Sequence, residues 1–211
     1  MSTGLNEALL QHAQELLPWL TEVRRDFHRY PEFGMEEFRT QEKISAYLNE
    51  LGIPHEKVAG TGIVGIIEGA HPGGVVGLRG DMDALPICEE NAVEYRSQIA
   101  GRMHACGHDA HMTCLLGAAR LLVAQKQQLG TDKVKVNELP SLGVEDFAFF
   151  AEHVPSAFYH LGVRNEQAGL VYPVHHPRFD LDERSLMIGA AMQACNALTF
   201  LQKQAAQGQA K

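Results

Sequence analysis

Hydrophobic residues recur at helical spacing in the first quarter of the chain. From Asn6 to about Arg29 they fall three or four positions apart, which predicts an amphipathic helix that is kinked or restarted at Pro18. The step Tyr30-Pro31 ends this helix. A second helix is expected from about Glu36 to Leu51, because a glycine and then a proline follow.

Short, β-branched runs bounded by glycine then replace the helical period. Gly62–Ile67 and Gly74–Leu78 are predicted to be buried strands. The second run leads into RGDMDALP, so its carboxylates would lie at the carboxyl end of a strand. Ligands and catalytic groups of open α/β sheets gather at that edge.

The rest of the chain continues the alternation of helix and strand. A helix is expected from about Ala110 to Gln127, with apolar residues along one face. Four further elements are predicted: a strand near Val134–Val136, a helix near Val144–Glu152, a strand near Ala157–Leu161 and a helix from about Ser185 to Leu201. The polar tail QKQAAQGQAK is expected to fray. This alternation predicts the α/β class, in a single domain over residues 1–211.

Composition narrows the possible functions. The formal net charge of -8, with no basic run, argues against nucleic acid or an anionic membrane as a partner. No stretch reaches the roughly 20 apolar residues of a membrane span, and the first residues lack the pattern of a signal peptide. The 4 cysteines are too few and too scattered for a disulfide framework, so a reducing cytoplasm is the expected compartment.

The segment GRMHACGHDAH, residues 101–111, concentrates metal-binding side chains. Cys106 and His108 are two positions apart, so they can project the same way from an extended loop, and Gly107 permits a turn between them. A thiolate with an imidazole suits borderline divalent metals, zinc above all. Asp109 can cap the following helix or orient an imidazole from behind.

A catalytic metal centre explains this cluster better than a structural one. A single histidine is more often a surface or core residue, but three within eight positions beside a cysteine are not expected by chance. There is no second cysteine pair, as structural zinc sites require. A further ligand is expected at His175 or His176, while Asp81 and Asp83 either orient ligands or form a solvated turn.

Five motifs together resemble a known family: RDFHRYPEFGMEEFRT, LRGDMDALP, MHACGHDAHM, GVEDFAFF and YPVHHPRFDLDE. In this order they are similar to the dinuclear-metal N-acyl-amino-acid amidohydrolases, which include hippurate hydrolase and the auxin-conjugate hydrolases. Aminoacylase and the metallo-carboxypeptidases are related to this group. The resemblance implies a zinc-peptidase-like, three-layer catalytic domain with a central, mostly parallel sheet between helices. It also implies divalent metal ions (zinc, manganese, cobalt or nickel), two of them in complete relatives.

The resemblance also implies roles for individual residues. It assigns Cys106, His108 and His175 as metal ligands, and Asp83 as the catalytic aspartate that stands behind the metal centre. The acids expected around this centre are Asp81, Asp109, Glu145 and Asp146. Three more histidines match family positions without being expected ligands: His104, His111 and His176.

The chain departs from the family pattern after the cluster helix. The family has a paired-glutamate motif there, which supplies the general base and a metal ligand, then a further histidine ligand and a lid domain that mediates dimerisation. None of these is found here, so we expect an internal excision near residues 129–133. The two glutamate pairs that remain, Glu36-Glu37 and Glu89-Glu90, match other positions of the family. Impaired turnover, one bound ion or none, and no lid-mediated homodimer are the expected consequences.

Three functions are compatible with these observations. The first is metal-dependent hydrolysis of the amide bond of N-acyl amino acids or small peptides, with a small-molecule substrate and neither nucleic acid nor membrane as partner. The second is a catalytically inactive metal-binding or interaction domain derived from the same family. The third, a cysteine hydrolase that uses Cys106 with a nearby histidine as base, explains fewer of the features.

Overall fold

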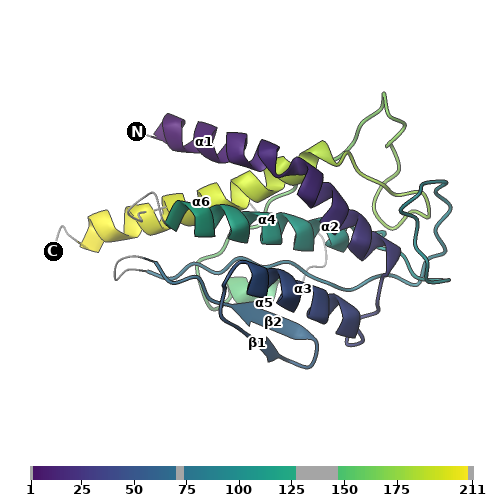
Figure 1. Cartoon of the computed structure of the whole chain (residues 1–211), viewed down its shortest axis with the longest axis horizontal. Coiled ribbons are helices and arrows are strands. Elements are labelled where there is room, and N and C mark those ends of the chain that lie inside the picture. Colours follow the sequence, from purple (N-terminus) through teal and green to yellow (C-terminus); the bar gives the residue numbers. More distant parts are fainter. Residues whose placement is uncertain (1, 70–73, 127–146, 209–211) are drawn as a thin grey trace.

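The computed structural model describes residues 2–69, 74–126 and 147–208 of the chain (Figure 1). Helices make up most of it, so this is a helix-rich α/β structure. In chain order the elements are α1 (Ser2–Glu15), α2 (Leu17–Arg29), α3 (Phe38–Glu50), β1 (His55–Val58), β2 (Gly62–Gly65), α4 (His108–Lys126), α5 (Phe147–Ala151) and α6 (Arg184–Gly208). None of the helices in the described ranges is both long and apolar enough to cross a membrane.

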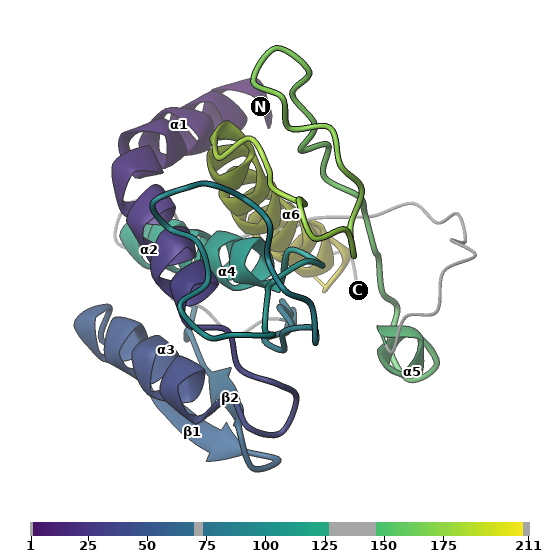
Figure 2. The ribbon, with the colours of Figure 1, turned by 90° about the vertical axis from the view of Figure 1, so that its right-hand side faces the viewer.

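Helix α4 lies at the centre of the helical packing (Figures 1 and 2). On one side it packs against α6, which also contacts α1, and on the other it packs against α2. The core between α1, α4 and α6 is built mainly of alanine and leucine, with Leu9, Ala118, Leu186, Ala190 and Ala194 among its buried members. Small residues let these helices approach closely, because short side chains leave little space between the backbones.

Two glycines mark the contact between α4 and α6. A Cβ atom at Gly117 would lie 2.7 Å from Leu20 and 2.8 Å from Ala190, which is closer than side chains tolerate. A Cβ at Gly189 would lie 2.5 Å from the sulfur of Cys114. Glycine is therefore required here by space, and the close approach fixes how α4 is oriented.

A second core lies on the opposite side of α4. It is formed by Val23 and Phe27 of α2, Leu48 of α3, and Met112 and Leu116 of α4, all buried. Helix α3 in turn packs on β2, so the small sheet is attached to the helices through α3. Together the two cores hold α4 on both sides, and the first turn of α4 carries the histidine cluster.

The expected central, mostly parallel sheet is not found in the part of the chain that the structure describes. The strands there are β1 and β2, which pair antiparallel with His55 opposite Gly65 and Val58 opposite Gly62. The first predicted strand is thus shorter than expected, and residues 74–78 form no strand. A strand needs a neighbour for its backbone hydrogen bonds, and the β-branched run around Val75 has none among the described residues.

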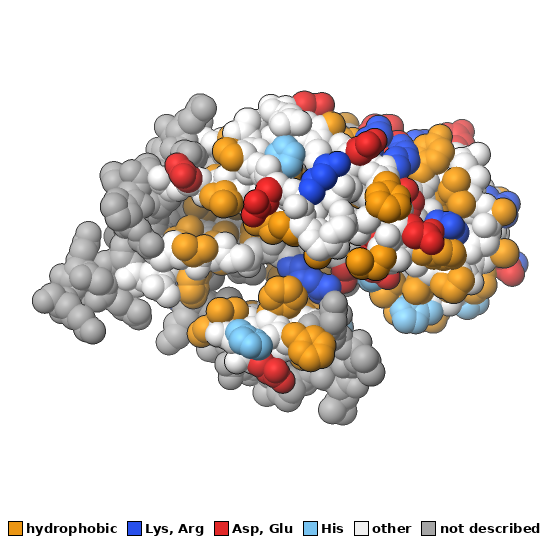
Figure 3. All heavy atoms as spheres, turned by 90° about the horizontal axis from the view of Figure 1, so that it is seen from below, with side chains coloured by type: hydrophobic (Ala, Val, Ile, Leu, Met, Phe, Trp, Pro, Cys, Tyr) orange, Lys and Arg blue, Asp and Glu red, His pale blue; other side chains and the backbone are white. Residues whose placement is uncertain are grey.

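Because no larger sheet covers these runs in the described part of the chain, some of their apolar side chains are exposed. Val75 is 90% exposed and Ile66 is 59% exposed, although both belong to runs whose composition predicts burial. Hydrophobic side chains are also spread over the face seen from below (Figure 3). Helix α5 buries none of its residues and lies apart from the other helices (Figure 2).

The helices predicted from periodicity are confirmed, and other expectations fail. The restart near Pro18 is seen as the break between α1 and α2. The polar tail is helical as far as Gly208, because glutamine, lysine and alanine are good helix formers. Ala157–Leu161 is not a strand and is largely exposed, and no segment among the described residues pairs with it. The predicted strand Val134–Val136, the start of the helix predicted at Val144–Glu152 and the expected excision site lie outside the described residues.

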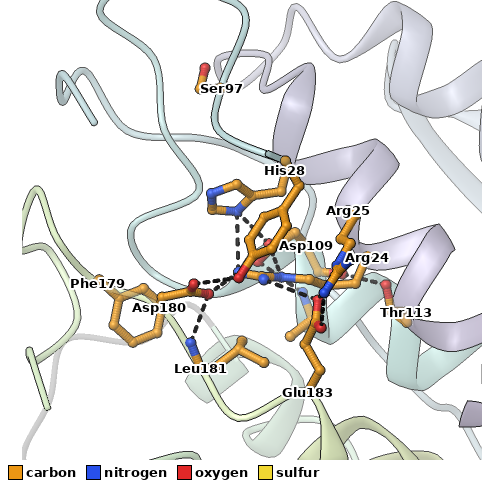
Figure 4. A network of polar contacts seen from close by, with 12 residues as sticks. Arg24, Arg25, His28, Ser97, Asp109, Thr113, Phe179, Asp180, Leu181 and Glu183 are labelled. Atoms are coloured by element: carbon orange, nitrogen blue, oxygen red, sulfur yellow. Dashed lines mark hydrogen bonds and ion pairs between the residues drawn. The ribbon is translucent and has the colours of Figure 1, made fainter. Parts of the chain in front are cut away.

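A fully buried arginine joins three segments of the fold (Figure 4). Arg24 of α2 donates through Nε to Asp109 Oδ2 at 2.8 Å and through Nη2 to Asp180 Oδ1 at 2.8 Å. Its Nη1 lies 3.4 Å from Glu183 Oε1. Burial alone would lower the pKa of Arg24, but the surrounding carboxylates, Asp109 first, raise it above its ordinary value. The guanidinium therefore stays charged and links α2 to the start of α4 and to the segment before α6.

His28 lies one turn further along α2 and is also buried. Its Nδ1 donates to Asp109 at 2.7 Å, and its Nε2 donates to Glu89 at 3.2 Å. Burial and the charge of Arg24 lower the pKa of His28, but the two carboxylates outweigh them and raise it. Since both ring nitrogens face carboxylates, which can only accept, the imidazole is held in its doubly protonated form.

Replacing Arg24 should destabilise the protein strongly. The substitution Arg24→Met leaves the buried carboxylates of Asp109 and Asp180 without their cation, which costs about 3–5 kcal/mol in comparable cases. Urea unfolding followed by circular dichroism measures this loss. Arg25→Met is the matched control, because Arg25 pairs with the same Glu183 but is partly exposed, so its loss should cost less than that of the fully buried Arg24. Equal losses in the two variants would contradict the role given to Arg24.

His28 should make stability depend on pH on the alkaline side. Its pKa is raised in the folded state, so its contribution is complete below the unfolded value of about 6.5 and is lost as pH rises through the folded value. In the variant His28→Gln this loss should be absent. The slope of the free energy of unfolding against pH should therefore differ by up to about 1.4 kcal/mol per pH unit between the variant and the unsubstituted chain. Urea unfolding between pH 6 and pH 9 tests the difference, with His153→Gln on the surface as control. Parallel curves for His28→Gln and the unsubstituted chain would refute the assignment.

Candidate metal centre

Three segments that are distant in sequence meet at the start of α4. The strand-like segment 79–85 is joined to the loop before α4 by a two-way bridge between Leu85 and Met103, with hydrogen bonds of 2.9 and 3.0 Å. The loop that contains His175 joins the same place, because its N–H donates to the carbonyl of Ala105 at 2.7 Å. Backbone hydrogen bonds therefore bring the aspartates, the histidine cluster and the distant histidine together.

A small apolar core supports this junction. Met103, Ala105 and Phe179 are buried together, with Leu85 and Ile87 packed against them. Separately, Gly80 lets the aspartate segment lie against α4, since a Cβ there would be only 3.2 Å from the carbonyl oxygen of His111. The site is thus built on packed backbone.

Gly107 directs the chain from the loop into the helix. Its φ of 85° lies in the left-handed region that glycine adopts easily. Its carbonyl then accepts from the N–H groups of Ala110 and His111, which begins α4. As a result Cys106 stays in the loop while His108 occupies the first turn, and the two side chains remain in contact.

Asp83 fixes the imidazole of His108. Nδ1 of His108 lies 2.8 Å from the carbonyl oxygen of Asp83 and 2.9 Å from its Oδ1. A carbonyl can only accept, so Nδ1 carries the proton and Nε2 remains for another partner. Burial lowers the pKa of His108, but hydrogen bonds to Asp83 and Cys106, with the charge of Asp81, raise it to about 11. An aspartate behind a histidine in this way orients metal-binding imidazoles.

Cys106 contacts both of the other predicted ligands. Its sulfur lies 3.3 Å from Nε2 of His175 and is hydrogen-bonded to His108. His175 has a φ of 68°, which a residue with a side chain seldom adopts. Such strained backbone is found where the surrounding structure imposes a side-chain direction, and here the direction is toward the thiol.

Asp81 and His111 add an oxygen and a nitrogen to the cluster. Nδ1 of His111 donates to Asp81 Oδ1 at 2.5 Å, and Asp81 Oδ2 lies 3.6 Å from Nε2 of His108. Burial would raise the pKa of Asp81, but the bond to His111 and the charges of His108, His111 and Arg79 lower it to about 2. The ligand atoms of Asp81, His108 and His111 all lie within 4.8 Å of one another. The sequence signal that could have indicated His111 as a neighbour of His108 is their spacing, because the two histidines are one helical turn apart.

The other predicted residues lie elsewhere. Asp109 points into the core, where it binds Arg24 and His28 instead of a cluster imidazole. His104 is buried, neither ring nitrogen has a partner within the described ranges, and burial lowers its pKa to about 4. His176 stacks on Tyr172 with ring centroids 4.4 Å apart. Glu145 and Asp146 lie outside the described residues. Sequence analysis missed the buried network of Arg24, His28, Glu89 and Asp180. His28 and Asp180 lie within two of the quoted motifs, but nothing in those motifs indicates that they pair with Arg24 or Asp109.

Each glutamate of the two pairs has a hydrogen-bond or ion-pair partner outside the cluster. Glu89 is engaged with His28, and Glu90 pairs with Arg178. Glu37 accepts from Thr61, and Glu36 pairs with Arg102. Within the described ranges, the group of side chains whose donors could hold an ion contains no glutamate.

The residues present fit a divalent metal ion. Tetrahedral zinc separates a sulfur and a nitrogen ligand by about 3.5 Å, given the usual bond lengths. The distance of 3.3 Å between Cys106 and His175 is close to this value. His108 offers a nitrogen whose ring is already oriented by Asp83, which is the arrangement that metal-binding histidines use.

Cysteine, histidine and aspartate side chains that meet at the start of a helix are typical of a site for a divalent metal ion. The family model for "Peptidase family M20/M25/M40" matches residues 77–137 and 123–198, a stretch that includes each cluster residue from Asp81 to His175. The chain belongs to this family of peptidases and amidohydrolases.

Individual relatives agree with this assignment. The chain is 44% identical over 124 residues to thermostable carboxypeptidase 1 of Saccharolobus solfataricus, which covers 58% of this chain and 32% of the relative. It is 46% identical over 131 residues to IAA-amino acid hydrolase ILR1-like 2 of Arabidopsis thaliana, and this match covers 61% of this chain and 30% of the relative. Its structure resembles that of the YXEP protein of Bacillus subtilis, which is described as a dinuclear metal binding peptidase. The TM-score is 0.53 at 37% identity, and the match covers 56% of this chain and 33% of the YXEP protein. The chain therefore spans about a third of the length of these relatives.

Proposed function

We propose that this chain is a metal-dependent hydrolase domain for the amide bond of N-acyl amino acids or small peptides, impaired by the absence of a general-base glutamate. The observation that carries the proposal is the convergence of Cys106, His108 and His175, with Asp83 behind His108. Relatives named as a carboxypeptidase and an IAA-amino acid hydrolase support amide hydrolysis as the reaction class.

Each of these residues has a distinct task. Cys106, His108 and His175 would hold the ion, which when bound polarises the acyl carbonyl and acidifies water. Asp83 keeps the proton of His108 on Nδ1, so that Nε2 remains available as a donor atom. Asp81 adds negative charge beside His108 and thereby favours a cation. We propose zinc, manganese, cobalt or nickel as the metal, since thiolate and imidazole ligands suit borderline ions.

The impairment follows from what the cluster lacks. Efficient metal-assisted hydrolysis needs a base that accepts the proton of water, and such assistance is worth roughly 10²–10⁴-fold in rate. Both glutamate pairs are occupied elsewhere in the fold. A catalytically inactive, metal-binding domain is the second candidate, and the absence of glutamate from the metal-capable group of the described residues favours it.

We also propose that the chain is a shortened single domain whose missing segment belongs near residues 129–133. The family model matches it in two segments that overlap at 123–137, and the chain spans about a third of its relatives. The three-layer architecture with a central parallel sheet would then be a property of the complete fold, as would the lid and the dimer that it mediates. The proposed setting is the cytoplasm, with a small-molecule substrate and neither nucleic acid nor membrane as partner.

Removing Cys106 should reduce metal binding. Cys106→Ser eliminates a thiolate donor, so at a zinc concentration that half-saturates the unsubstituted chain the variant should hold less zinc after equilibrium dialysis, as measured by elemental analysis. Cys88→Ser is the matched control, because Cys88 is a free, exposed cysteine. An unchanged zinc content in Cys106→Ser at this sub-saturating concentration would show that the thiol is not a ligand.

Turnover should be slow and should depend on metal. Deacetylation of an N-acetyl amino acid with saturating zinc, manganese or cobalt should be at least about 10²-fold slower than in a complete homologue. A chelator should abolish it. Bound metal without any turnover would favour the inactive domain, whereas turnover that survives the chelator but not alkylation of Cys106 would favour the cysteine hydrolase. Turnover equal to that of a complete homologue would refute the proposed impairment.

Asp83 should tune metal affinity from behind the site. Asp83→Asn removes the charge that orients and polarises His108, so the dissociation constant for zinc should rise about 10–100-fold. Isothermal titration calorimetry measures the change. Glu166→Gln removes one negative charge from the exposed surface and serves as the matched control. An unchanged dissociation constant in Asp83→Asn would remove Asp83 from the site.

A further inference from the structure

The most compact set of donor atoms in the described part of the chain differs from the predicted ligand set. It consists of Asp81, His108 and His111, whose ligand atoms all lie within 4.8 Å of one another. The two histidines come from the first turn of α4, with ring centroids 5.3 Å apart, and the aspartate comes from the segment that Gly80 holds against this turn. Three donors from two rigid segments are thus already grouped without the thiol.

An ion pair between Asp81 and His111 explains only part of this arrangement. It accounts for Oδ1 of Asp81, which accepts from His111. It does not account for Oδ2, which lies 3.6 Å from Nε2 of His108, too far for a hydrogen bond but suitable for two atoms that share an ion. Arg79 lies 3.8 Å from the same oxygen and is the cationic neighbour with which an ion would compete.

We propose that Asp81, His108 and His111 form an oxygen–nitrogen site for one divalent transition-metal ion, which shares His108 with the site at Cys106 but differs from it in the other ligands. One carboxylate and two imidazoles suit zinc, manganese and cobalt. The ion replaces two protons, the one that His111 shares with Asp81 and the one on Nε2 of His108, and both pass to solvent. His111 is half exposed, so the remaining coordination positions are open to water.

The two sites share His108 and are therefore alternatives. Asp83 occupies Nδ1 of this ring, so Nε2 is its one nitrogen for a metal, and the ring also contacts the thiol of Cys106. An ion bound with Asp81 and His111 cannot use the same nitrogen as an ion bound with Cys106 and His175. This sharing rests on the proposed function, whereas the oxygen–nitrogen site itself does not. The chain should bind one ion at this cluster, not two.

Cobalt titration of the full chain separates the two sites, because cobalt bound to a thiolate has a charge-transfer absorption that cobalt bound to nitrogen and oxygen lacks. Cys106→Ser should lose this absorption but still bind one cobalt ion by calorimetry. Adding Asp81→Asn and His111→Gln to Cys106→Ser should weaken the remaining binding at least tenfold. His111→Gln alone in the Cys106→Ser background is a milder variant, since this side chain is half exposed. His153→Gln with Glu166→Gln, on the surface, is the matched control.

Each result decides between the two assignments. If Cys106→Ser binds no cobalt while the unsubstituted chain does, the oxygen–nitrogen site is refuted and the thiolate site stands. If the triple variant binds as tightly as Cys106→Ser, the oxygen–nitrogen site is also refuted. If the unsubstituted chain binds two ions together at this cluster, the shared use of His108 is wrong. If it binds none, both the proposed function and this site fail.

Discussion

The buried guanidinium of Arg24 is the interaction on which the rest of the structure depends. A charge without solvent must be fully compensated, and Arg24 finds compensation from Asp109 at the start of α4 and from Asp180 before α6. These partners lie 85 and 156 positions away in sequence. Because a guanidinium has fixed, planar donors, the contacts determine orientation as well as proximity. The relative placement of α2, α4 and α6 follows from this one side chain together with the close packing at Gly117 and Gly189.

The same network positions the candidate metal centre. Asp109 and His108 are adjacent at the start of α4, but their side chains serve opposite purposes. Asp109 points inward to Arg24 and His28, while His108 points outward to Asp83 and Cys106. The first turn of α4 is therefore anchored from the core side, and the direction of His108 is a consequence of that anchoring. Rigid elements that hold a site through packed and hydrogen-bonded neighbours are what metal binding requires.

The sequence patterns predicted those features that are determined by neighbouring residues in the chain. The helices were predictable because their apolar periodicity is contained in each segment, and the cluster was predictable because Cys106, Gly107 and His108 are contiguous. The strands could not be predicted in the same way, because a β-branched run such as Gly74–Leu78 becomes a strand only when a neighbouring strand is available for its backbone hydrogen bonds. The network of Arg24 was also missed, because nothing near Arg24 indicates that its partners lie at Asp109 and Asp180. The pairing of Asp81 with His111 depends on how two segments dock, which no motif specifies.

In the function that we propose, the cluster keeps its metal ligands while the general base is lacking. Its positions are set by backbone contacts, namely the bridge between Leu85 and Met103 and the hydrogen bond from His175 to Ala105, and by the core beneath them. None of these contacts involves the segment that the family would place after α4. The arrangement of the cluster therefore depends only on the helix start and its neighbours. In the proposed function, the capacity to hold an ion is thus separable from the capacity to accept a proton from water. Because the group within reach of His108 contains no glutamate among the described residues, two pairs of side chains can complete a site around this imidazole: Asp81 with His111, or Cys106 with His175. In our proposal, the pair that binds more tightly decides where the ion resides.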